Sequence, residues 1–426
     1  MHFDTLKGWL DWQETLHPKS IDLGLERVTQ VFQRLNPYGK KPITITVAGT
    51  NGKGSSIAFL DAIYCAQGLR VGAYTSPHII QYNERIKING TAVSDELICE
   101  SFARIEAVRE NVSLSYFEFS TLAALDIFAR DDLDIQLLEV GLGGRLDAVN
   151  IIDPDATIVT NISLDHTAWL GETREAIGFE KAGVFRPNTA AIISDPHPPQ
   201  SLIDYADKIQ APLARIGHEF DYQKYSTDWS WKNTNDKLDA LPFPRLKGTH
   251  QYRNAAAVLT AIQALQGKIP VSEQAIKQGL RTAYLPGRFQ IINSEPTVLL
   301  DVSHNVQAAQ ALADYLQEEF QTRPVHAIFT MMNDKDKQSI IKLMQPFIKH
   351  WYISPLDTPR NSKKVDLVDA FQQCNIKQVS FDFNDFMSTF QAAKINAQSD
   401  NGLVLVFGSF FLVSEYLSLF SDFSGK

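Results

Sequence analysis

The sequence of 426 residues predicts an α/β protein with two domains. Apolar runs of strand length alternate with amphipathic segments of helix length, and this alternation is typical of parallel sheets with crossover helices. Two such series follow each other along the chain, and a Pro-Gly pair at residues 286–287 lies in the connector between them. We therefore expect an N-terminal parallel-sheet domain over residues 1–288 and a smaller, Rossmann-like α/β domain over residues 289–426.

The first series supplies the elements of the N-terminal domain. Residues 43–48 predict a buried strand, a glycine-rich loop follows it, and residues 55–67 predict a helix that ends at Gly68. The same patterns predict further strands at 71–74, 135–140 and 157–160 and a helix over 119–130. Each of these strands ends at a loop that carries polar residues.

The second series begins near residue 298. Its predicted strands, separated by helical segments, are 298–302, 327–330, 351–354, 379–381 and 403–407. Before it, residues 221–244 are rich in Trp, Tyr, Asn, Asp and Lys without a clear period, which predicts an irregular or hairpin excursion.

Composition and charge exclude several classes of function. A net charge of −9 and a pI near 5.6 give no basic field, so we expect no nucleic-acid partner. No apolar run approaches the roughly 20 residues that cross a bilayer, and the N-terminus lacks the pattern of a secretory signal. The three cysteines, Cys65, Cys99 and Cys374, are scattered and argue against a disulfide framework. We expect a cytoplasmic protein without membrane contact.

The strongest local signal is the loop Gly49-Thr50-Asn51-Gly52-Lys53-Gly54-Ser55. A glycine-rich loop between a strand and a helix presents backbone N–H groups to phosphate, Lys53 adds a positive charge, and Ser55 offers a hydroxyl to Mg²⁺. The loop departs from the common P-loop pattern, because Val47 stands where its first glycine would be and Gly54 separates Lys53 from the hydroxyl residue. The alternative is an ordinary glycine turn, but the composition favours a P-loop-type ATPase domain.

Further candidates lie at the ends of predicted strands, where open α/β sheets place their ligands. They are Ser76, Glu139 and His166. Glu139 interrupts an apolar strand, and a buried carboxylate needs a metal ion or a cation, so Mg²⁺ binding and a buried salt bridge are both open. His166 could bind metal, although a single histidine is more often structural. By residue chemistry alone, Lys181 is as well explained as a solvated surface lysine.

Several motifs together resemble one family. They are the glycine loop 49–55, Ser76-Pro77-His78, the run 139–147 (EVGLGGRLD), Leu164-Asp165-His166, Glu180-Lys181-Ala182-Gly183, the run 250–256 (HQYRNAA), Pro286-Gly287-Arg288-Phe289 and the run 301–305 (DVSHN). In order and spacing they resemble folylpolyglutamate synthases, which are members of the Mur ligase superfamily. The resemblance covers nearly the whole chain.

That resemblance implies an ATP-dependent amide ligase. ATP would phosphorylate a carboxylate, the amine of L-glutamate would attack the acyl phosphate, and phosphate would leave. The chemistry is reasonable, because a carboxylate is a poor electrophile until it carries a better leaving group, and catalysis then depends on alignment and charge neutralisation. The C-terminal domain would contribute to glutamate and nucleotide binding.

The family's functional residues can be matched to positions in this chain. Lys53 would contact the β- and γ-phosphates, and Lys53, His166 and Lys181 would be catalytic. One or two Mg²⁺ ions would be held by Ser55, Ser76, Glu139, His166 and Lys181, the last matching a lysine that is carbamylated in the family and so becomes an oxygen ligand. ATP would contact the loop Gly49, Thr50, Asn51, Gly52, Lys53, Gly54 and Ser55, and also Asn254, Arg288 and Asp301.

Two further stretches, residues 21–28 and 116–119, resemble the pterin-binding portion of bifunctional bacterial members, which also act as dihydrofolate synthases. Phe117 would stack on the flat pterin ring, although an ordinary aromatic core is the alternative. The implied substrate residues are Asp22, Leu23, Gly24, Tyr116, Phe117, Glu118, Leu146, Asp147, Ala148 and His304. The implied partners are dihydropteroate, tetrahydrofolate and its polyglutamates, and L-glutamate, bound by a monomer.

Two other functions were weighed against this one. A Mur-type ligase of a nucleotide-linked cell-wall precursor fits less well, because only about 40 residues precede the glycine loop. A nucleotide-dependent switch or binding protein would hydrolyse ATP without any amino acid. The sequence leaves open the length of the polyglutamate, the preferred folate and a requirement for K⁺.

Overall fold

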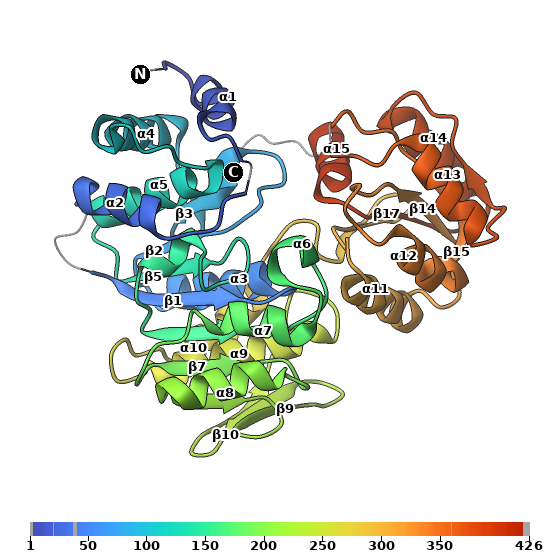
Figure 1. Cartoon of the computed structure of the whole chain (residues 1–426). Helices are drawn as coiled ribbons and strands as arrows, with labels where there is room; N and C mark the ends of the chain where they lie inside the picture. The colour runs from blue at the N-terminus through green and yellow to red at the C-terminus, as the bar shows by residue number, and fades with distance from the viewer. Residues whose placement is uncertain (1–2, 20, 37–40, 359, 421–426) are drawn as a thin grey trace. The chain divides into compact units, whose positions relative to one another are not determined.

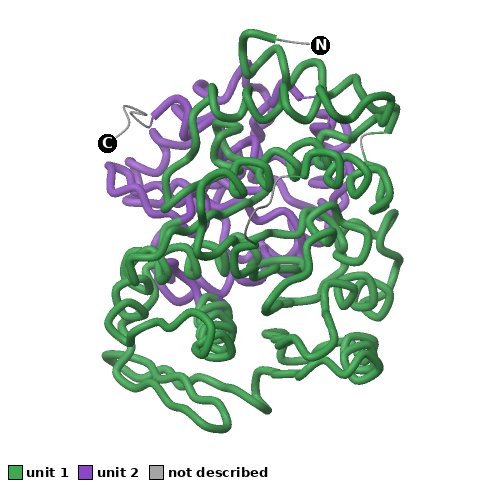
Figure 2. The backbone as a smooth tube through the Cα atoms, turned by 90° about the vertical axis from the view of Figure 1, so that its left-hand side faces the viewer, with its two compact units in different colours: residues 1–245, 251–284 green, residues 246–250, 285–426 purple. Residues whose placement is uncertain are grey.

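The computed structural model describes residues 3–19, 21–36, 41–358 and 360–420. The chain forms two compact units, coloured separately in Figure 2: unit 1 comprises Met1–Arg245 and Gln251–Tyr284, and unit 2 comprises Leu246–His250 and Leu285–Lys426. The division therefore lies a few residues before the expected boundary at 288/289. The segment 246–250 belongs to unit 2 because the His250 ring packs edge-on against Phe289, with 5.3 Å between ring centroids.

Unit 1 is built on an eight-stranded sheet in the order β4-β3-β2-β5-β1-β6-β7-β8 (Figure 1). The strands from β2 to β8 in this order are parallel, whereas β3 and β4 pair antiparallel at one edge. Their bounds are β1 Ile43–Ala48, β2 Val71–Tyr74, β3 Ile86–Ile88, β4 Thr91–Ala92, β5 Ile135–Glu139, β6 Ala156–Val159, β7 Ala190–Ile193 and β8 Leu213–Arg215. The central strands β1 and β5 are almost wholly buried, and their sequences, ITITVA and IQLLE, are mainly apolar. The Gln136 amide N–H on β5 donates to Thr44 Oγ1 on β1 at 2.9 Å, so these two buried polar groups are paired.

Helices join these strands. They are α1 Leu6–Leu16, α2 Glu26–Leu35, α3 Lys53–Ala66, α4 Asp95–Arg109, α5 Tyr116–Arg130, α6 Thr167–Leu170, α7 Arg174–Ala182, α8 Gln200–Ile209, α9 His250–Ala264 and α10 Glu273–Thr282, with 3₁₀ turns η1 Tyr82–Arg85 and η2 Ala148–Ile151. Helices α1, α2, α4 and α5 pack together near strands β2 and β3, as Figure 1 shows. Helix α10 packs on α3. The expected helix 119–130 begins earlier, at Tyr116, because Ser115 and Glu118 form a capping box there.

The segment expected to be an irregular or hairpin excursion is a three-stranded antiparallel sheet. Its strands are β9 Phe220–Lys224, β10 Trp229–Asn233 and β11 Lys237–Leu241, in the order β11-β10-β9. Trp229 and Trp231 on β10 are buried, and the Trp231 indole N–H donates to Thr260 Oγ1 of α9 at 3.1 Å. These alternating large side chains anchor the small sheet to the body of unit 1.

Unit 2 is a second α/β layer with a six-stranded sheet in the order β12-β13-β17-β14-β15-β16. Its strands are β12 Gln290–Ile292, β13 Val298–Asp301, β14 Val325–Phe329, β15 Ile348–Ile353, β16 Val379–Ser380 and β17 Leu403–Phe407, and its helices are α11 Val306–Glu319, α12 Lys337–Met344, α13 Lys364–Gln373, α14 Phe386–Ser399 and α15 Phe410–Phe420, with η3 Gln345–Phe347. All pairs are parallel except β12 with β13. The five predicted strands of this series are present, and β12 is an edge strand that the sequence did not reveal.

The α/β fold class is confirmed, with a larger parallel-sheet unit followed by a smaller one. In the described part of the chain, no helix is both long enough and apolar enough to cross a membrane.

Candidate active site

The glycine loop joins the end of β1 to the start of α3, as expected. Gly49 and Gly52 have φ values of +138° and +91°, which L-residues with side chains rarely adopt. A Cβ atom on Gly49 would lie 1.8 Å from Thr160 Oγ1, and one on Gly52 would lie 2.7 Å from Asn254 Oδ1. The two glycines therefore let the loop turn sharply while neighbouring side chains approach its backbone closely.

The segment after β6 holds this loop in place. Backbone N–H groups of Thr50 and Asn51 donate to the carbonyl oxygen and to Oδ1 of Asn161, both at 2.7 Å. The Thr160 hydroxyl donates to the Asn51 carbonyl at 2.6 Å. Sequence reasoning assigned no role to Thr160 or Asn161, although polar residues directly after a buried strand are the signal that could have identified them.

Two lysines converge on the loop. Lys53 Nζ donates to the carbonyl oxygens of Gly49 and Thr50 at 3.1 and 3.2 Å, and Lys181 Nζ donates to the Gly49 carbonyl at 2.9 Å. Lys181 is only 4% exposed, so the interpretation as a solvated surface lysine is wrong. Burial, with a smaller contribution from the nearby positive charge of Lys53, lowers the pKa of Lys181 to about 7.

Contacts with the loop 141–147 hold α7, and with it Lys181, in this position. A Cβ atom on Gly144 would lie 2.9 Å from the Glu180 carbonyl, so the two segments touch through backbone atoms. The Arg145 N–H donates to the same carbonyl at 2.8 Å, and the Arg145 guanidinium forms an ion pair with the Glu180 carboxylate at 2.8 Å. Lys181 follows Glu180 and therefore turns into the loop region.

A polar chain on α9 reaches the start of α3. Ser55 is buried, and its Oγ accepts from Gln251 Nε2 at 3.2 Å. Asn254 Nδ2 donates to Gln251 Oε1 at 3.0 Å, and Asn254 lies beside Gly52. The structure thus brings Asn254 to the glycine loop, and it adds Gln251, which had not been singled out.

The candidate metal residues lie at the ends of neighbouring strands. Glu139 ends β5 and pairs in register with Val47, just before the glycine loop. The Ser76 N–H donates to Glu139 Oε2 at 3.2 Å. His166 has a left-handed backbone with φ of +51° at the start of α6, and its N–H donates to Asp165 Oδ1 at 2.9 Å. Among the described residues, no three His, Cys, Asp or Glu side chains cluster closely enough to form a metal site by themselves.

The expected pterin residues come together from three parts of the chain. The Gly24 N–H donates to the Leu146 carbonyl at 3.2 Å. Phe117, in the first turn of α5, lies against Gly141, where a Cβ atom would be 2.5 Å from its ring. Asp147 is the N-cap of η2, which begins at Ala148.

The Asp147 carboxylate is 2% exposed, and burial raises its pKa to about 7. It accepts hydrogen bonds from the backbone N–H groups of Leu142 at 2.8 Å and Val149 at 3.1 Å. These bonds favour the ionised form, but desolvation outweighs them. Asp147 therefore titrates near neutral pH.

Arg27 connects the other two parts of this region. Its guanidinium forms ion pairs with Asp22 at 2.7 Å and with Glu118 at 3.0 Å, and it also donates to the Asp22 carbonyl at 2.8 Å. A hydrogen bond from Lys19 is the largest effect that lowers the pKa of Asp22. The segment 22–24, which includes Leu23, is thereby tied to the first turn of α5 with Tyr116 and Glu118. The sequence analysis did not single out Arg27, because the contact with Glu118 that joins the two segments spans 91 residues.

The remaining candidates belong to unit 2. Asp301 ends β13, is 3% exposed, and accepts from the N–H groups of Phe289 at 3.1 Å and Ser303 at 2.9 Å. The Arg288 guanidinium lies over the Phe410 ring, 4.9 Å from its centroid. The His304 Nδ1 lies 3.0 Å from the Val302 carbonyl. These three residues therefore gather at the β13 end of the unit 2 sheet.

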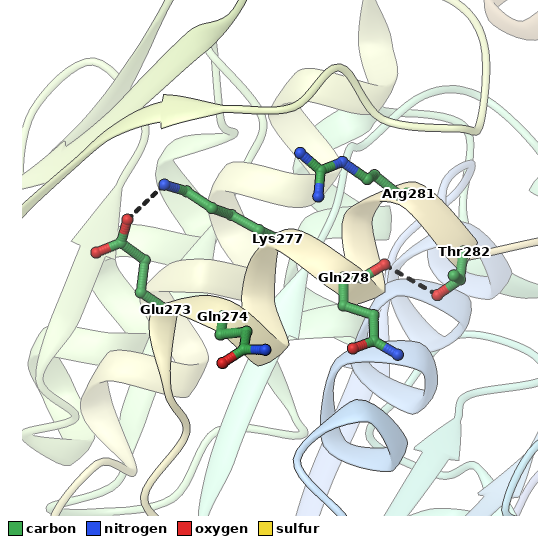
Figure 3. Close-up of a pocket in the computed structure, with 6 residues that line it drawn as sticks. All are labelled: Glu273, Gln274, Lys277, Gln278, Arg281 and Thr282. Atoms are coloured by element: carbon green, nitrogen blue, oxygen red, sulfur yellow. Dashed lines mark hydrogen bonds and ion pairs between the residues drawn. The ribbon is translucent and has the colours of Figure 1, made fainter.

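A surface hollow of about 470 Å³ is lined by none of these residues. It runs along helix α10 and is lined by Glu273, Gln274, Lys277, Gln278, Arg281 and Thr282 (Figure 3). Lys277 is paired with Glu273 at 2.6 Å, and the lining comes from one helix. None of the candidate site residues lines it, and we assign it no role.

Comparison with known proteins agrees with this geometry. Residues 287–410 match the family "Mur ligase, glutamate ligase domain". The dihydrofolate synthase/folylpolyglutamate synthase of Escherichia coli (strain K12) is 41% identical over 414 residues, which cover 97% of this chain and 95% of that protein. The chain belongs to the dihydrofolate synthase/folylpolyglutamate synthase family.

Other members of the dihydrofolate synthase/folylpolyglutamate synthase family are similarly close. The Haemophilus influenzae member is 38% identical, covering 96% of each chain. The structure of E. coli FolC in complex with DHPP and ADP superposes with a TM-score of 0.91 at 40% identity, covering 98% of this chain and 97% of that one. A bifunctional folylpolyglutamate synthase/dihydrofolate synthase with Mn, AMPPNP and L-glutamate bound has a TM-score of 0.90 at 40% identity, covering 98% of both chains. The family resemblance predicted from the motifs is confirmed.

Proposed function

We propose that this chain joins L-glutamate to dihydropteroate and to reduced folates at the expense of ATP. Membership of the dihydrofolate synthase/folylpolyglutamate synthase family makes it an ATP-dependent ligase of glutamate to folate. Similar structures contain ADP, AMPPNP, Mn, DHPP and L-glutamate, which are a nucleotide, a divalent metal, a folate-site ligand and the amino acid. The observation in this structure that supports the assignment best is the pair of lysines on the Gly49 carbonyl.

The glycine loop fits the phosphates of ATP. Gly49 and Gly52 leave the backbone bare where any Cβ atom would collide, and the N-terminus of α3 follows immediately. Exposed N–H groups and the helix dipole favour a bound anion at this point. Lys53 Nζ, which donates to the carbonyl oxygens of Gly49 and Thr50, would exchange these partners for phosphate oxygens. On this proposal Asn254 on α9 is a nucleotide contact, as are Arg288 and Asp301.

The side chains for one or two Mg²⁺ ions are Ser55, Ser76, Glu139 and His166. This set offers one carboxylate, one imidazole and two hydroxyls, which is few anionic ligands for a hard dication. Carbamylation of Lys181 would add a second carboxylate-like group. A buried amine with a pKa of about 7 is neutral in a substantial fraction of molecules near neutral pH, and the neutral amine is the form that reacts with CO₂. The metal, when bound, would neutralise charge on the transferred phosphoryl group.

The reaction proceeds in two balanced steps. A carboxylate oxygen of the acceptor attacks the γ-phosphorus of ATP, and ADP leaves. The neutral amine of L-glutamate then attacks the acyl carbon, and phosphate leaves with one oxygen of the original carboxylate, while the amine loses its proton. The protein aligns the reactants and places Lys53 where negative charge accumulates.

The acceptor lies, on this proposal, with its pterin ring against Phe117. The segments 22–24 and 146–148, which the bond from the Gly24 N–H to the Leu146 carbonyl holds together, would border the ring edge, and Asp147 titrates there. Tyr116 and Glu118 flank Phe117 on α5, and His304 would contact the substrate from unit 2. We also propose that the protein is a cytoplasmic monomer that binds neither nucleic acid nor membrane. Whether it requires K⁺ is a question for the assay.

Phosphate release by the purified chain with Mg-ATP tests the activity. Dihydropteroate and tetrahydrofolate are supplied as separate acceptors, with and without L-glutamate and with K⁺ or Na⁺. Glutamate-dependent release with both acceptors supports the bifunctional assignment. Release that needs no amino acid would instead indicate a nucleotide-dependent switch, and release with neither folate would contradict the proposal.

The role of Lys181 has a separate test. The Lys181→Ala variant should lose turnover by at least a hundredfold, and a short carboxylate such as acetate should restore part of it by replacing the carbamate. The matched control is Lys208→Ala, because Lys208 is exposed at the end of α8. Near-normal turnover of Lys181→Ala would exclude the carbamate.

A further inference from the structure

A buried arginine lies between the candidate metal residues and the candidate pterin residues. Among the described residues, Arg85 is the one arginine that is buried, at 9% exposure. It ends the 3₁₀ turn η1, and its Nε donates to His78 Nδ1 at 2.8 Å. The guanidinium carbon lies 5.5 Å from the ring centroids of both Tyr82 and Tyr116. Arg85 is thus fixed between two aromatic rings.

The positive charge of Arg85 is not balanced within the described chain. No carboxylate of the described residues forms an ion pair with it, and its Nη groups donate to none of them. Other arginines of unit 1 with limited exposure do have acidic partners, such as Arg27 with Glu118 and Arg109 with Glu106. A guanidinium stays protonated even when buried, and an uncompensated charge in such a place is unfavourable. The two aromatic rings offset only part of this.

Two buried hydroxyls lie close to each other beside Arg85. Tyr82 is 4% exposed and Ser120 is fully buried, and Ser120 is near enough to Tyr82 to oppose the rise that burial causes in the Tyr82 pKa. Neither hydroxyl has a hydrogen-bond partner of good geometry among the described residues. Ser120 lies on α5, one helical turn after Tyr116. Buried hydroxyls without partners are rare in native proteins unless a ligand or water binds them. Together with Arg85, these poorly bonded hydroxyls offer donors to a polar ligand group.

The position of Arg85 identifies that group. On one side, His78 lies two residues after Ser76, whose N–H donates to Glu139. On the other side, Tyr116 precedes Phe117, which lies against Gly141. A folate acceptor that extends from Phe117 toward the phosphates of ATP would pass Arg85. The negative charges of such an acceptor are carboxylates. We propose that Arg85 binds a carboxylate of the folate acceptor, with Tyr82 and Ser120 as additional hydrogen-bond partners.

This inference rests on the proposed function and identifies a specificity residue within it. Dihydropteroate has one carboxylate, which is the reacting group, whereas a folate that already carries glutamate also has an α-carboxylate that does not react. A guanidinium binds a carboxylate through two parallel hydrogen bonds, which a lysine ammonium cannot reproduce. If Arg85 binds the reacting carboxylate, it contributes to the binding of both acceptors. If it binds the α-carboxylate, it contributes to the binding of the glutamylated acceptor alone.

The test compares the parent with Arg85→Gln and Arg85→Lys. Loss of a charge-assisted contact should raise the KM for the acceptor about 10- to 100-fold, with the KM for ATP unchanged, and Arg85→Lys should be intermediate. An equal effect on dihydropteroate and tetrahydrofolate assigns Arg85 to the reacting carboxylate, and a selective effect on tetrahydrofolate assigns it to the α-carboxylate. Arg70→Gln is the control, because Arg70 is half-exposed and pairs with Asp131.

Two readouts separate the possible failures. Circular dichroism and thermal unfolding show whether Arg85→Gln still folds, and Arg85→Lys remains available if it does not. An active parent with unchanged acceptor KM in folded Arg85 variants overturns this inference alone. A parent without glutamate-dependent phosphate release would instead contradict the proposed function.

Discussion

At the residue scale, the glycine loop depends on backbone conformations that only glycine adopts easily. Replacing Gly49 by Ala places a methyl group 1.8 Å from Thr160 Oγ1 at a φ of +138°. We expect Gly49→Ala to lower the free energy of unfolding by about 2–4 kcal/mol and to abolish ATP turnover. Urea unfolding and phosphate release measure the two effects.

Gly68 provides the matched control for Gly49. Its φ is +84°, but a Cβ atom there meets nothing within 4 Å. Gly68→Ala should therefore cost only about 1 kcal/mol of backbone strain and keep full turnover. Equal losses in both variants would show that strain, rather than the close approach to Thr160, makes Gly49 necessary.

Asp147 gives a prediction about pH. Its pKa is raised from 3.8 in the unfolded chain to about 7 in the folded protein, so the folded state retains a proton that the unfolded state has lost. The resulting stability is complete below pH 4 and is lost as the pH rises through 7. Relative to Asp147→Asn, the parent should lose roughly 2–3 kcal/mol between pH 5 and pH 8. Parallel curves of unfolding free energy against pH would contradict the assigned burial.

Sequence chemistry identified most of these residues but could not establish their surroundings. Lys53 and Glu139 stood out because a glycine-flanked lysine and a carboxylate in an apolar strand are locally unusual. Lys181 looked like any helix-surface lysine, because its burial depends on contact between Gly144 and α7. Arg27 and Arg85 gave no local signal, since their contacts with Glu118 and Tyr116 join segments that are distant in sequence.

At the element scale, helix α5 positions Tyr116, Phe117 and Glu118. The Ser115 Oγ accepts from the Glu118 N–H at 3.3 Å, and Glu118 Oε2 accepts from the Ser115 N–H at 2.7 Å. This capping box fixes the first turn, which carries the proposed pterin contact. The start of the helix therefore affects function as well as stability.

Ser115→Ala should lower the free energy of unfolding by about 1 kcal/mol and raise the KM for dihydropteroate several-fold. Ser94→Ala removes the equivalent cap of α4, where Ser94 Oγ accepts from the Leu97 N–H at 3.3 Å, and should lower stability alone. Denaturant unfolding and steady-state kinetics distinguish the variants. A raised KM in Ser94→Ala would show a general effect of loosening rather than a local one.

Buried strands were the elements most readily predicted from sequence. The runs at β1, β2 and β17 match their predicted bounds, because strands buried on both faces are rich in apolar and β-branched residues. The sequence analysis missed five strands, β3, β4, β7, β8 and β12. Each is only two to four residues long, which leaves little periodic signal. The sheet β9–β11 lacked a clear period because its aromatic side chains pack on unit 1.

At the scale of the whole molecule, motif order predicted the family more reliably than any single residue did. The glycine loop departs from the common P-loop pattern at Val47 and Gly54, yet its place between β1 and α3 is that of a P-loop. The exact division of the chain could not be predicted, because segment 246–250 joins unit 2 through contacts with Phe289. Spatial contact, not sequence continuity, determines that division.

The most direct test of the ligase mechanism traces the carboxylate oxygen of the acceptor into the released phosphate. Dihydropteroate labelled with ¹⁸O in its carboxylate is incubated with the chain, Mg-ATP and L-glutamate, and the released phosphate is analysed by mass spectrometry. An acyl-phosphate intermediate predicts one ¹⁸O atom in each phosphate released with product. Phosphate without ¹⁸O, formed at the same rate as product, would contradict the account.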